Sequence, residues 1–328
     1  MSYAARCFLP LSIICFLLAF CVVGLGAYVR LSDAGLGCPD WPGCYGELFV
    51  TEETQAIAAQ QAPETRPFNR SKAVKEMVHR YAAGILGILV LLLTMLSWRL
   101  GNRERISCSF LLGLVAVQSL LGMWTVTELL KPLIVAAHLL GGMLILGLLY
   151  WIILGQFPRK TRGSGKLPRV NRLALVGLAV LAVQIFSGAW TSANYAALAC
   201  PEFPVCRDGL WWPETDFKEA FTLWREGRVD YEGGILDAPA RTAIHLTHRL
   251  GAALTFVFIL YVALCAFGRR EPAMRLNAVV LLCILCLQAS LGIANVLLRL
   301  PLPVAVAHNT VAALLLLSLL TLYRQARL

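Results

Sequence analysis

Charged residues are scarce in this sequence. Only 15% of its 328 residues are Asp, Glu, Lys or Arg, whereas 58% are apolar, and the mean hydropathy is +0.69. This composition excludes a soluble domain of this length. No basic patch alternates with aromatic residues, which argues against nucleic acid as a partner despite the net charge of +10. The first apolar run also lacks an A-x-A site, so we expect no signal-peptide cleavage after it.

Long apolar stretches are what the sequence does contain. A helix needs about 20 mostly apolar residues to cross the hydrocarbon of a bilayer, where no water satisfies the backbone. Eight stretches meet this requirement, at residues 8–29, 74–96, 106–126, 133–154, 173–193, 243–267, 276–298 and 304–323. The sequence therefore predicts an all-α, polytopic membrane protein with eight transmembrane helices surrounded by membrane lipids.

Basic residues concentrate on one side of the predicted membrane helices. Fifteen of the 29 Lys and Arg residues lie at the start, at the end, or in the loops after the second, fourth and sixth helices. Those segments hold only two acidic residues, Glu104 and Glu271. Because basic residues are enriched in cytoplasmic segments, we expect both termini in the cytoplasm.

The two halves of the sequence repeat each other. GAYVR matches GAWTS at an offset of 162 residues, VHRYAAG matches THRLGAA at 169, and VQSLLGMWTV matches LQASLGIANV at 170. Since each copy has four helices, both copies enter the membrane in the same direction and form parallel repeats. We expect one four-helix bundle over residues 1–156, a basic, Gly- and Pro-containing cytoplasmic linker over 157–172, and a second bundle over 173–328.

Each half also carries a stiff loop with two cysteines. The segments CPDWPGC (residues 38–44) and CPEFPVC (residues 200–206) both fall on the outer face, after the first and fifth helices. In an oxidising compartment, Cys38 with Cys44 and Cys200 with Cys206 are expected to form disulfides. Zinc binding and free thiols are the alternatives. The other seven cysteines lie in or beside membrane spans, where they are expected to pack as small apolar residues.

All five histidines lie near the outer ends of the even-numbered predicted helices. The repeat pairs His79 with His138 in the first half and His248 with His308 in the second, and His245 is additional. Facing imidazoles in a helical bundle can hold a heme iron, and small residues follow each of the four paired histidines. The sequence therefore predicts two heme sites. The alternative is hydrogen-bonding histidines beside closely packed small residues.

Charged neighbours distinguish the two predicted sites. Arg80 and Arg249 each follow a candidate ligand, where they are expected to bind heme propionates or to extend toward lipid headgroups. Glu76 precedes His79 by three residues, whereas His245 holds the corresponding position in the second half. A carboxylate in one half only suggests chemistry there, although a glutamate near a helix N-terminus is also favoured by the helix dipole.

Five segments together resemble the heme A synthase family, in the branch that has a cysteine pair in each half. They are VRLSDAGLGCPDWPGCYG, KEMVHRYAAGILG, AAHLLGGMLIL, HLTHRLGAAL and AVAHNTVAALL, in this order along the chain. The resemblance implies an enzyme of the inner (plasma) membrane that oxidises the C8 methyl group of heme O, through an alcohol, to the formyl group of heme A. It also implies that the protein acts in one pathway with heme O synthase and with the assembly of terminal cytochrome oxidases.

The resemblance assigns roles to individual residues. His248 and His308 would be axial ligands of a permanent heme b in the second half. His79 and His138 would hold heme O or heme A in the first, with Glu76 as a catalytic carboxylate. Two ligands on the substrate iron leave no place for dioxygen, so either one ligand lets go or oxidation proceeds without oxygen bound there.

Two other functions are compatible with the same residues. One is a di-heme b-type membrane electron carrier that oxidises quinol, and the other is a transporter or heme carrier without redox chemistry. A di-heme electron carrier leaves the asymmetric carboxylate Glu76 and the outer cysteine pairs unexplained. A transport site usually lies near the membrane midplane, whereas the histidines lie near one end of the helices. The sequence does not identify the electron donor.

Overall fold

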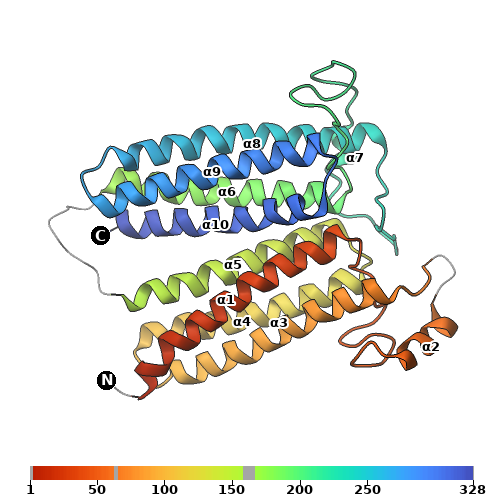
Figure 1. The fold of residues 1–328 in the computed structure, drawn as a ribbon, viewed down its shortest axis with the longest axis horizontal. Helices are drawn as coiled ribbons and strands as arrows, with labels where there is room; N and C mark the ends of the chain where they lie inside the picture. The colour runs from red at the N-terminus through yellow and green to blue at the C-terminus, as the bar shows by residue number, and fades with distance from the viewer. Residues whose placement is uncertain (1–2, 63–65, 158–166, 328) are drawn as a thin grey trace. The chain divides into compact units, whose positions relative to one another are not determined.

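The structure is a computed structural model that describes residues 3–62, 66–157 and 167–327. In these residues all ten regular elements are α-helices (Figure 1). Eight helices are long and apolar enough to span a membrane, which confirms the predicted fold class. They are α1 (Tyr3–Leu31), α3 (Arg70–Ser97), α4 (Asn102–Thr127), α5 (Pro132–Gln156), α6 (Pro168–Ala193), α8 (Ala238–Phe267), α9 (Pro272–Leu297) and α10 (Leu302–Ala326). The chain is an integral membrane protein.

Several helices begin before the apolar stretch that predicts them. The side chain of Asn69 caps α3 by accepting a hydrogen bond from the Lys72 amide at 3.1 Å, and Asp237 caps α8 in the same way through the Ala240 amide at 2.9 Å. Capped first turns can be polar, so hydropathy misses them. Helix α6 likewise begins at Pro168, within the range expected to be linker. The basic linker residues Arg159, Lys160, Arg162 and Lys166 lie outside the described residues.

The chain divides into two compact units. The first comprises Met1–Ile152 together with Leu223–Ile235, and the second comprises Ile153–Thr222 and Leu236–Leu328. In the second unit, α6 contacts α8 and α10, and α9 contacts the same two helices, which closes a ring of four. In the first unit, α3 packs against α1 and α4. Helix α5 contacts α1 through Phe16 and Tyr150, whose ring centroids are 5.6 Å apart.

Repeated turns follow corresponding helices in the two halves of the chain. Leu129 and Leu130 follow α4 with φ of 48° and 62°, and Arg299 and Leu300 follow α9 with φ of 56° and 60°. Such pairs of left-handed residues are uncommon outside glycine, so their presence at equivalent positions is a shared feature of both halves.

The cysteine pairs of both outer loops are disulfide-bonded, Cys38 to Cys44 and Cys200 to Cys206, as predicted. In the first loop, the carboxylate of Asp40 accepts hydrogen bonds from the amides of Tyr45 and Gly46 at 2.6 and 2.7 Å. In the second loop, the carboxylate of Glu202 binds the corresponding amides at 3.1 and 3.3 Å. The acidic residue of the repeated motif therefore holds the backbone of its own loop.

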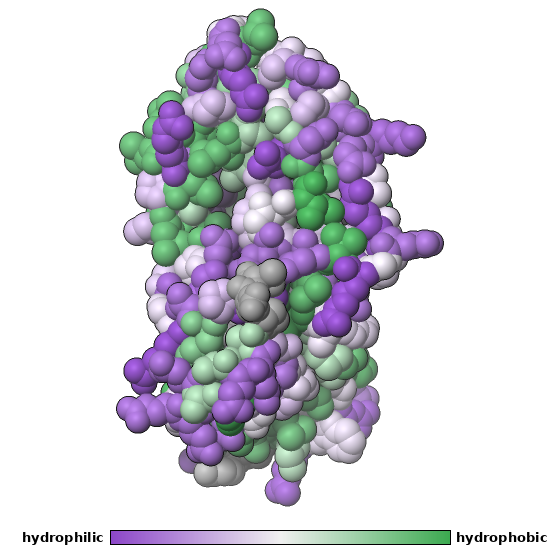
Figure 2. All heavy atoms as spheres, turned by 90° about the vertical axis from the view of Figure 1, so that its right-hand side faces the viewer, coloured by the Kyte–Doolittle hydropathy of each residue, from purple (hydrophilic) through white to green (hydrophobic). Residues whose placement is uncertain are grey.

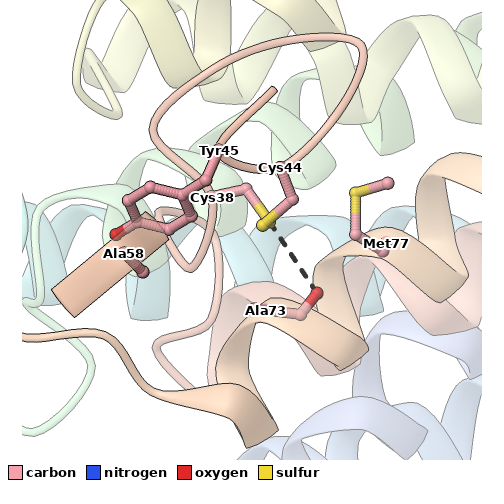
Figure 3. Packing of buried hydrophobic residues seen from close by; sticks show 6 residues of the cluster. All are labelled: Cys38, Cys44, Tyr45, Ala58, Ala73 and Met77. Carbon is pink, nitrogen blue, oxygen red and sulfur yellow. Dashed lines mark hydrogen bonds between the residues drawn. A yellow bond between two sulfur atoms is a disulfide. The ribbon is translucent and has the colours of Figure 1, made fainter. Parts of the chain in front are cut away.

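The first outer loop contains a helix that the sequence analysis does not predict, α2 (Glu52–Gln61). Its Ala58 is buried with both cysteines of the first loop and with Met77 of α3 (Figure 3).

A shorter helix, α7 (Phe217–Ala220), lies in the second outer loop and packs on α8. Figure 2 shows polar and hydrophobic side chains intermingled on the face that it presents. Exposed aromatic residues of the two loops, such as Phe49, Trp211 and Trp212, suit a membrane–water interface.

Candidate functional site

In the first unit, both predicted ligand histidines pack against a glycine of a neighbouring helix. A methyl group on Gly26 of α1 would lie 3.0 Å from Cε1 of His79, and one on Gly122 of α4 would lie 3.1 Å from Cε1 of His138. The two imidazoles are close enough to interact electrostatically. Nδ1 of each ring is buried and makes no hydrogen bond of normal geometry with the described residues. Buried polar atoms normally have a partner, so these two nitrogens indicate a ligand-binding site between α3 and α5.

The second unit repeats this arrangement. A methyl group on Gly188 of α6 would lie 3.2 Å from Cε1 of His248, and one on Gly292 of α9 would lie 3.1 Å from Cε1 of His308. These two imidazoles also interact electrostatically, and Nδ1 of His308 is buried without a partner in the described part of the chain. Each unit therefore presents two imidazoles from different helices, each cradled by a glycine. This donor set fits axial ligation of one heme per unit.

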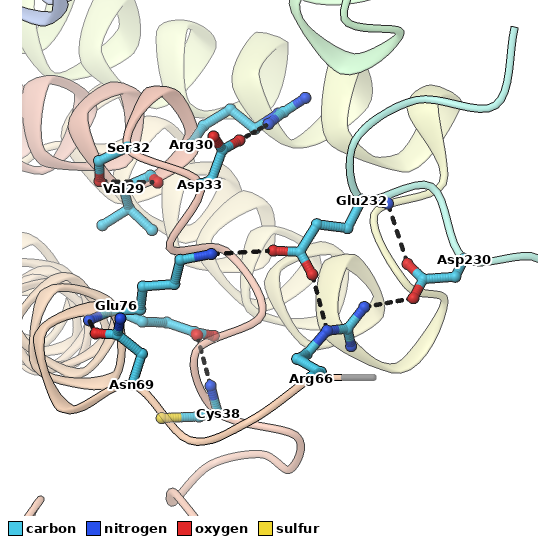
Figure 4. A network of polar contacts seen from close by, with 11 residues as sticks. Val29, Arg30, Ser32, Asp33, Cys38, Arg66, Asn69, Glu76, Asp230 and Glu232 are labelled. Carbon is cyan, nitrogen blue, oxygen red and sulfur yellow. Dashed lines mark hydrogen bonds and ion pairs between the residues drawn. The ribbon is translucent and has the colours of Figure 1, made fainter. Parts of the chain in front are cut away.

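Glu76 is bound to the first disulfide loop. It is 4% exposed, and its Oε2 accepts a hydrogen bond from the Cys38 amide at 3.0 Å (Figure 4). Its Oε1 lies 2.5 Å from the guanidinium of Arg80. The same guanidinium donates to the carbonyls of Asp40 at 2.8 Å and Gly43 at 2.5 Å. Glu76 and Arg80 together hold the loop against α3.

His245 does the same in the second unit. Its Nδ1 accepts a hydrogen bond from the Cys200 amide at 3.1 Å, and its Nε2 lies 3.1 Å from Nε of Arg249. The Arg249 guanidinium donates to the carbonyls of Val205 at 3.0 Å and of Cys200 and Glu202 at 2.8 Å. A carboxylate and an imidazole therefore occupy equivalent positions and make equivalent contacts with their loops.

The arginines are not extended toward lipid headgroups. Only 11% of the Arg80 side chain is exposed, and the described contacts of Arg80 and Arg249 are with the loops and with the residue four positions earlier. Pairing of these two arginines with heme propionates stays a prediction.

A segment from the second half of the sequence belongs to the first unit. We call Leu223–Ile235 the strap. Arg66, which precedes α3, donates to Asp230 at 2.5 Å and to Glu232 at 2.8 Å, and Lys72 lies 3.5 Å from Glu232 (Figure 4). These contacts join residues separated by at least 160 positions in the sequence.

A buried tyrosine fixes the centre of the strap. Tyr231 is 4% exposed and packs against Leu36, Val126 and Leu130. Its backbone amide donates to the carbonyl of Leu129 at 3.1 Å. The strap therefore covers the turn between α4 and α5 as well as the first outer loop.

Trp224 of the strap borders an apolar cavity of about 350 Å³. Leu121 and Ala137, which directly precede Gly122 and His138, also line this cavity. The Lys131 ammonium group lies 3.6 Å from the centre of the Trp224 ring. The strap thus borders the same cavity as residues of α4 and α5.

Reversing the charge of Glu232 is expected to loosen the strap. Glu232→Arg would place a third cation beside Arg66 and Lys72, and the lost ion pairs are worth about 1 kcal/mol each at most because they are partly exposed. Chymotrypsin, for which the substitution creates no new site, should then cleave the strap at Leu223 or Trp224 about fivefold faster, since cleavage follows the open population.

The double variant Arg66→Glu/Glu232→Arg restores one opposite-charge pair and is expected to slow cleavage again. Equal cleavage rates in wild type and the single variant would contradict a role for these ion pairs in holding the strap.

Comparison with known proteins places the chain in a family. The model of the COX15-CtaA family, described as a cytochrome oxidase assembly protein, matches residues 10–320. The chain belongs to this family. A heme A synthase of Shewanella oneidensis is 43% identical over 303 residues, which cover 92% of this chain and 91% of the relative.

More distant COX15-CtaA relatives cover a similar share of the chain. A heme A synthase of Chelativorans sp. is 28% identical over 90% of this chain and 84% of its own length. One of Bacillus licheniformis is 25% identical over 88% of this chain and 85% of its own. The range matched by the family model, residues 10–320, includes both repeats and both cysteine loops.

The four cradle glycines of this COX15-CtaA chain are absent from the sequence prediction, which names small residues on the histidine helices instead. The sequence repeat could have identified these glycines. Gly26 of GAYVR corresponds to Gly188 of GAWTS, and Gly122 of VQSLLG corresponds to Gly292 of LQASLG. The strap has no such signal, because its Asp-Tyr-Glu sequence has no equivalent in the first half.

Proposed function

We propose that this protein is a heme A synthase that oxidises the C8 methyl group of heme O to a formyl group. One observation supports this function above others: each unit brings two imidazoles together against glycines, and only the first has a carboxylate three residues before a ligand. The 43% identity with a heme A synthase supports the same assignment.

The two halves take different roles in this proposal. The bundle over residues 1–156 holds heme O and then heme A through His79 and His138. The bundle over 173–328, which follows the linker at 157–172, holds a permanent heme b through His248 and His308. When bound, the second heme supplies electron transfer.

Glu76 is the proposed catalytic carboxylate. It lies one helical turn from His79, on the same face of α3, and its buried carboxylate is oriented by Arg80 and by the Cys38 amide. A carboxylate held in this way can exchange protons with a substrate beside it. His245, its counterpart, is a buried neutral imidazole beside the Arg249 guanidinium, which disfavours proton uptake, and this supports a second heme that is not modified.

The proposed surroundings follow from the activity. Heme O synthase would supply the substrate, and heme A would pass to the assembly of terminal cytochrome oxidases. The concentration of basic residues on one side supports a plasma-membrane protein with both termini in the cytoplasm.

Heme extraction tests the function. Membranes that contain this protein and a heme O source are expected to yield heme A on chromatography, whereas membranes with heme O alone yield none. A di-heme electron carrier would leave heme O unchanged, so the absence of heme A beside a protein that retains two b-type hemes would overturn the proposal.

A further inference from the structure

The apolar cavity of about 350 Å³ lies where α4 ends and α5 begins, in the first unit. Leu121 and Trp124 line it from α4, Ile134 and Ala137 from α5, and Trp224 from the strap. Its volume is within the range of small-molecule sites, about 300–1,000 Å³. Because six of the seven lining residues are apolar, the cavity suits an apolar ligand or the apolar part of a larger one.

The strap wall of this cavity is fixed by charged residues of the first unit. The Lys131 ammonium group lies 3.6 Å from the centre of the Trp224 ring, which is a cation–π contact. Lys131 is 4% exposed and lies 3.1 Å from the carboxylate of Glu128, the seventh lining residue. These contacts hold the indole of Trp224 at the cavity.

The cavity adjoins the predicted heme site of the first unit. Ile134 lies one helical turn before His138, on the same face of α5. Helices α3 and α5 are diagonal in this unit, because each contacts α1 and α4. A porphyrin whose iron binds His79 of α3 and His138 of α5 lies across that diagonal, so that its edges point toward α1 and α4. One edge then faces the helix that forms a wall of the cavity.

Two walls of the cavity have no equivalent in the second unit. The repeat places Ala294 at the position of Trp124, and Leu298 at that of Glu128. The second unit consists of residues 153–222 and 236–328, so among the described residues no loop of the first half takes the place of Trp224 there. Both tryptophan walls therefore belong to the first unit alone.

We propose that this cavity binds the isoprenoid side chain of heme O and thereby selects heme O over heme b in the first unit. Heme O carries this long hydrocarbon chain on the edge of its porphyrin, where heme b has a vinyl group. Contacts of the chain with Trp124 and Trp224 supply affinity that heme b cannot obtain. The inference rests on the proposed function, which makes heme O the ligand of His79 and His138.

A displacement experiment measures this selectivity. Purified full chain loaded with heme O is incubated with increasing heme b, and the heme O and heme A that stay bound are counted together by chromatography. In Ala137→Leu, which fills the cavity, the heme b concentration that displaces half of them should fall about tenfold or more. A change of one methylene in an apolar pocket alters discrimination by about 10- to 200-fold. Ala307→Leu, the equivalent change in α10, is the matched control and should behave as the wild type.

The displacement midpoint depends on the isoprenoid chain, because a general defect weakens binding of both hemes alike and leaves it unchanged. Trp224→Ala, which removes the strap wall, should lower the midpoint in the same direction. An unchanged midpoint in Ala137→Leu overturns the inference, as does a midpoint that Ala307→Leu lowers equally. Failure of the proposed function would be seen separately, as wild-type protein whose bound heme O is never converted to heme A.

Discussion

Glu76→His is expected to stop heme A formation while both hemes remain bound. His245 already occupies the equivalent position in the second unit, where it accepts the loop-cysteine amide and contacts the arginine four residues later. Histidine at position 76 can therefore hold the first loop, but a buried imidazole beside the Arg80 guanidinium takes up a proton poorly and cannot replace the anionic carboxylate as a proton acceptor. Loss of a general acid or base costs about 100-fold or more in rate. Chromatography of the extracted hemes measures this loss, and the spectrum of the purified protein reports heme retention.

This substitution separates chemistry from structure better than alanine does. Glu76→Ala would leave the Arg80 guanidinium and the Cys38 amide without their buried partner, at a cost of about 3–5 kcal/mol in stability. The converse variant, His245→Glu, is the control and should leave heme A formation intact. Wild-type amounts of heme A from Glu76→His would show that Glu76 has no catalytic role and only binds the disulfide loop.

Gly188→Val is expected to remove the heme from the second unit. Even a single methyl group at this position would lie 3.2 Å from Cε1 of His248, and valine adds two more carbon atoms against the ring. Overpacking of this kind costs about 1–3 kcal/mol, enough to turn the imidazole away from its position. The heme-to-protein ratio, measured as the pyridine hemochrome, should fall by half.

Gly113→Val on α4 is the matched control, because a methyl group there would meet no atom within 4 Å. It should retain the full heme content, whereas Gly26→Val should lose the heme of the first unit instead. A Gly188→Val protein with full heme content would show that His248 does not ligate heme from its position against α6.

Local patterns account for the features that could be predicted from the sequence. Each membrane span contains a long, mostly apolar run, and each disulfide joins cysteines six positions apart. The paired histidines could be predicted because the repeat places them at equivalent positions near the same ends of helices. These features need no knowledge of how distant segments pack.

The remaining features depend on contacts between distant segments. The Cys38 amide and the Glu76 carboxylate are 38 residues apart, and a helical glutamate gives no sign that it binds a loop. Helix α2 is short and polar, so no hydropathy pattern marks it.

The strap also has a consequence for biogenesis. Domains usually fold as units in the order of their synthesis, but the first unit here includes residues 223–235. Its outer surface therefore stays incomplete until the ribosome has made α6 and the loop beyond it has been translocated. A polypeptide truncated within the linker would leave Leu36, Val126 and Leu130 without the Tyr231 side chain that buries them. Completion of the amino-terminal unit must accordingly wait for α6 and the loop that follows it, although not for α8, α9 or α10.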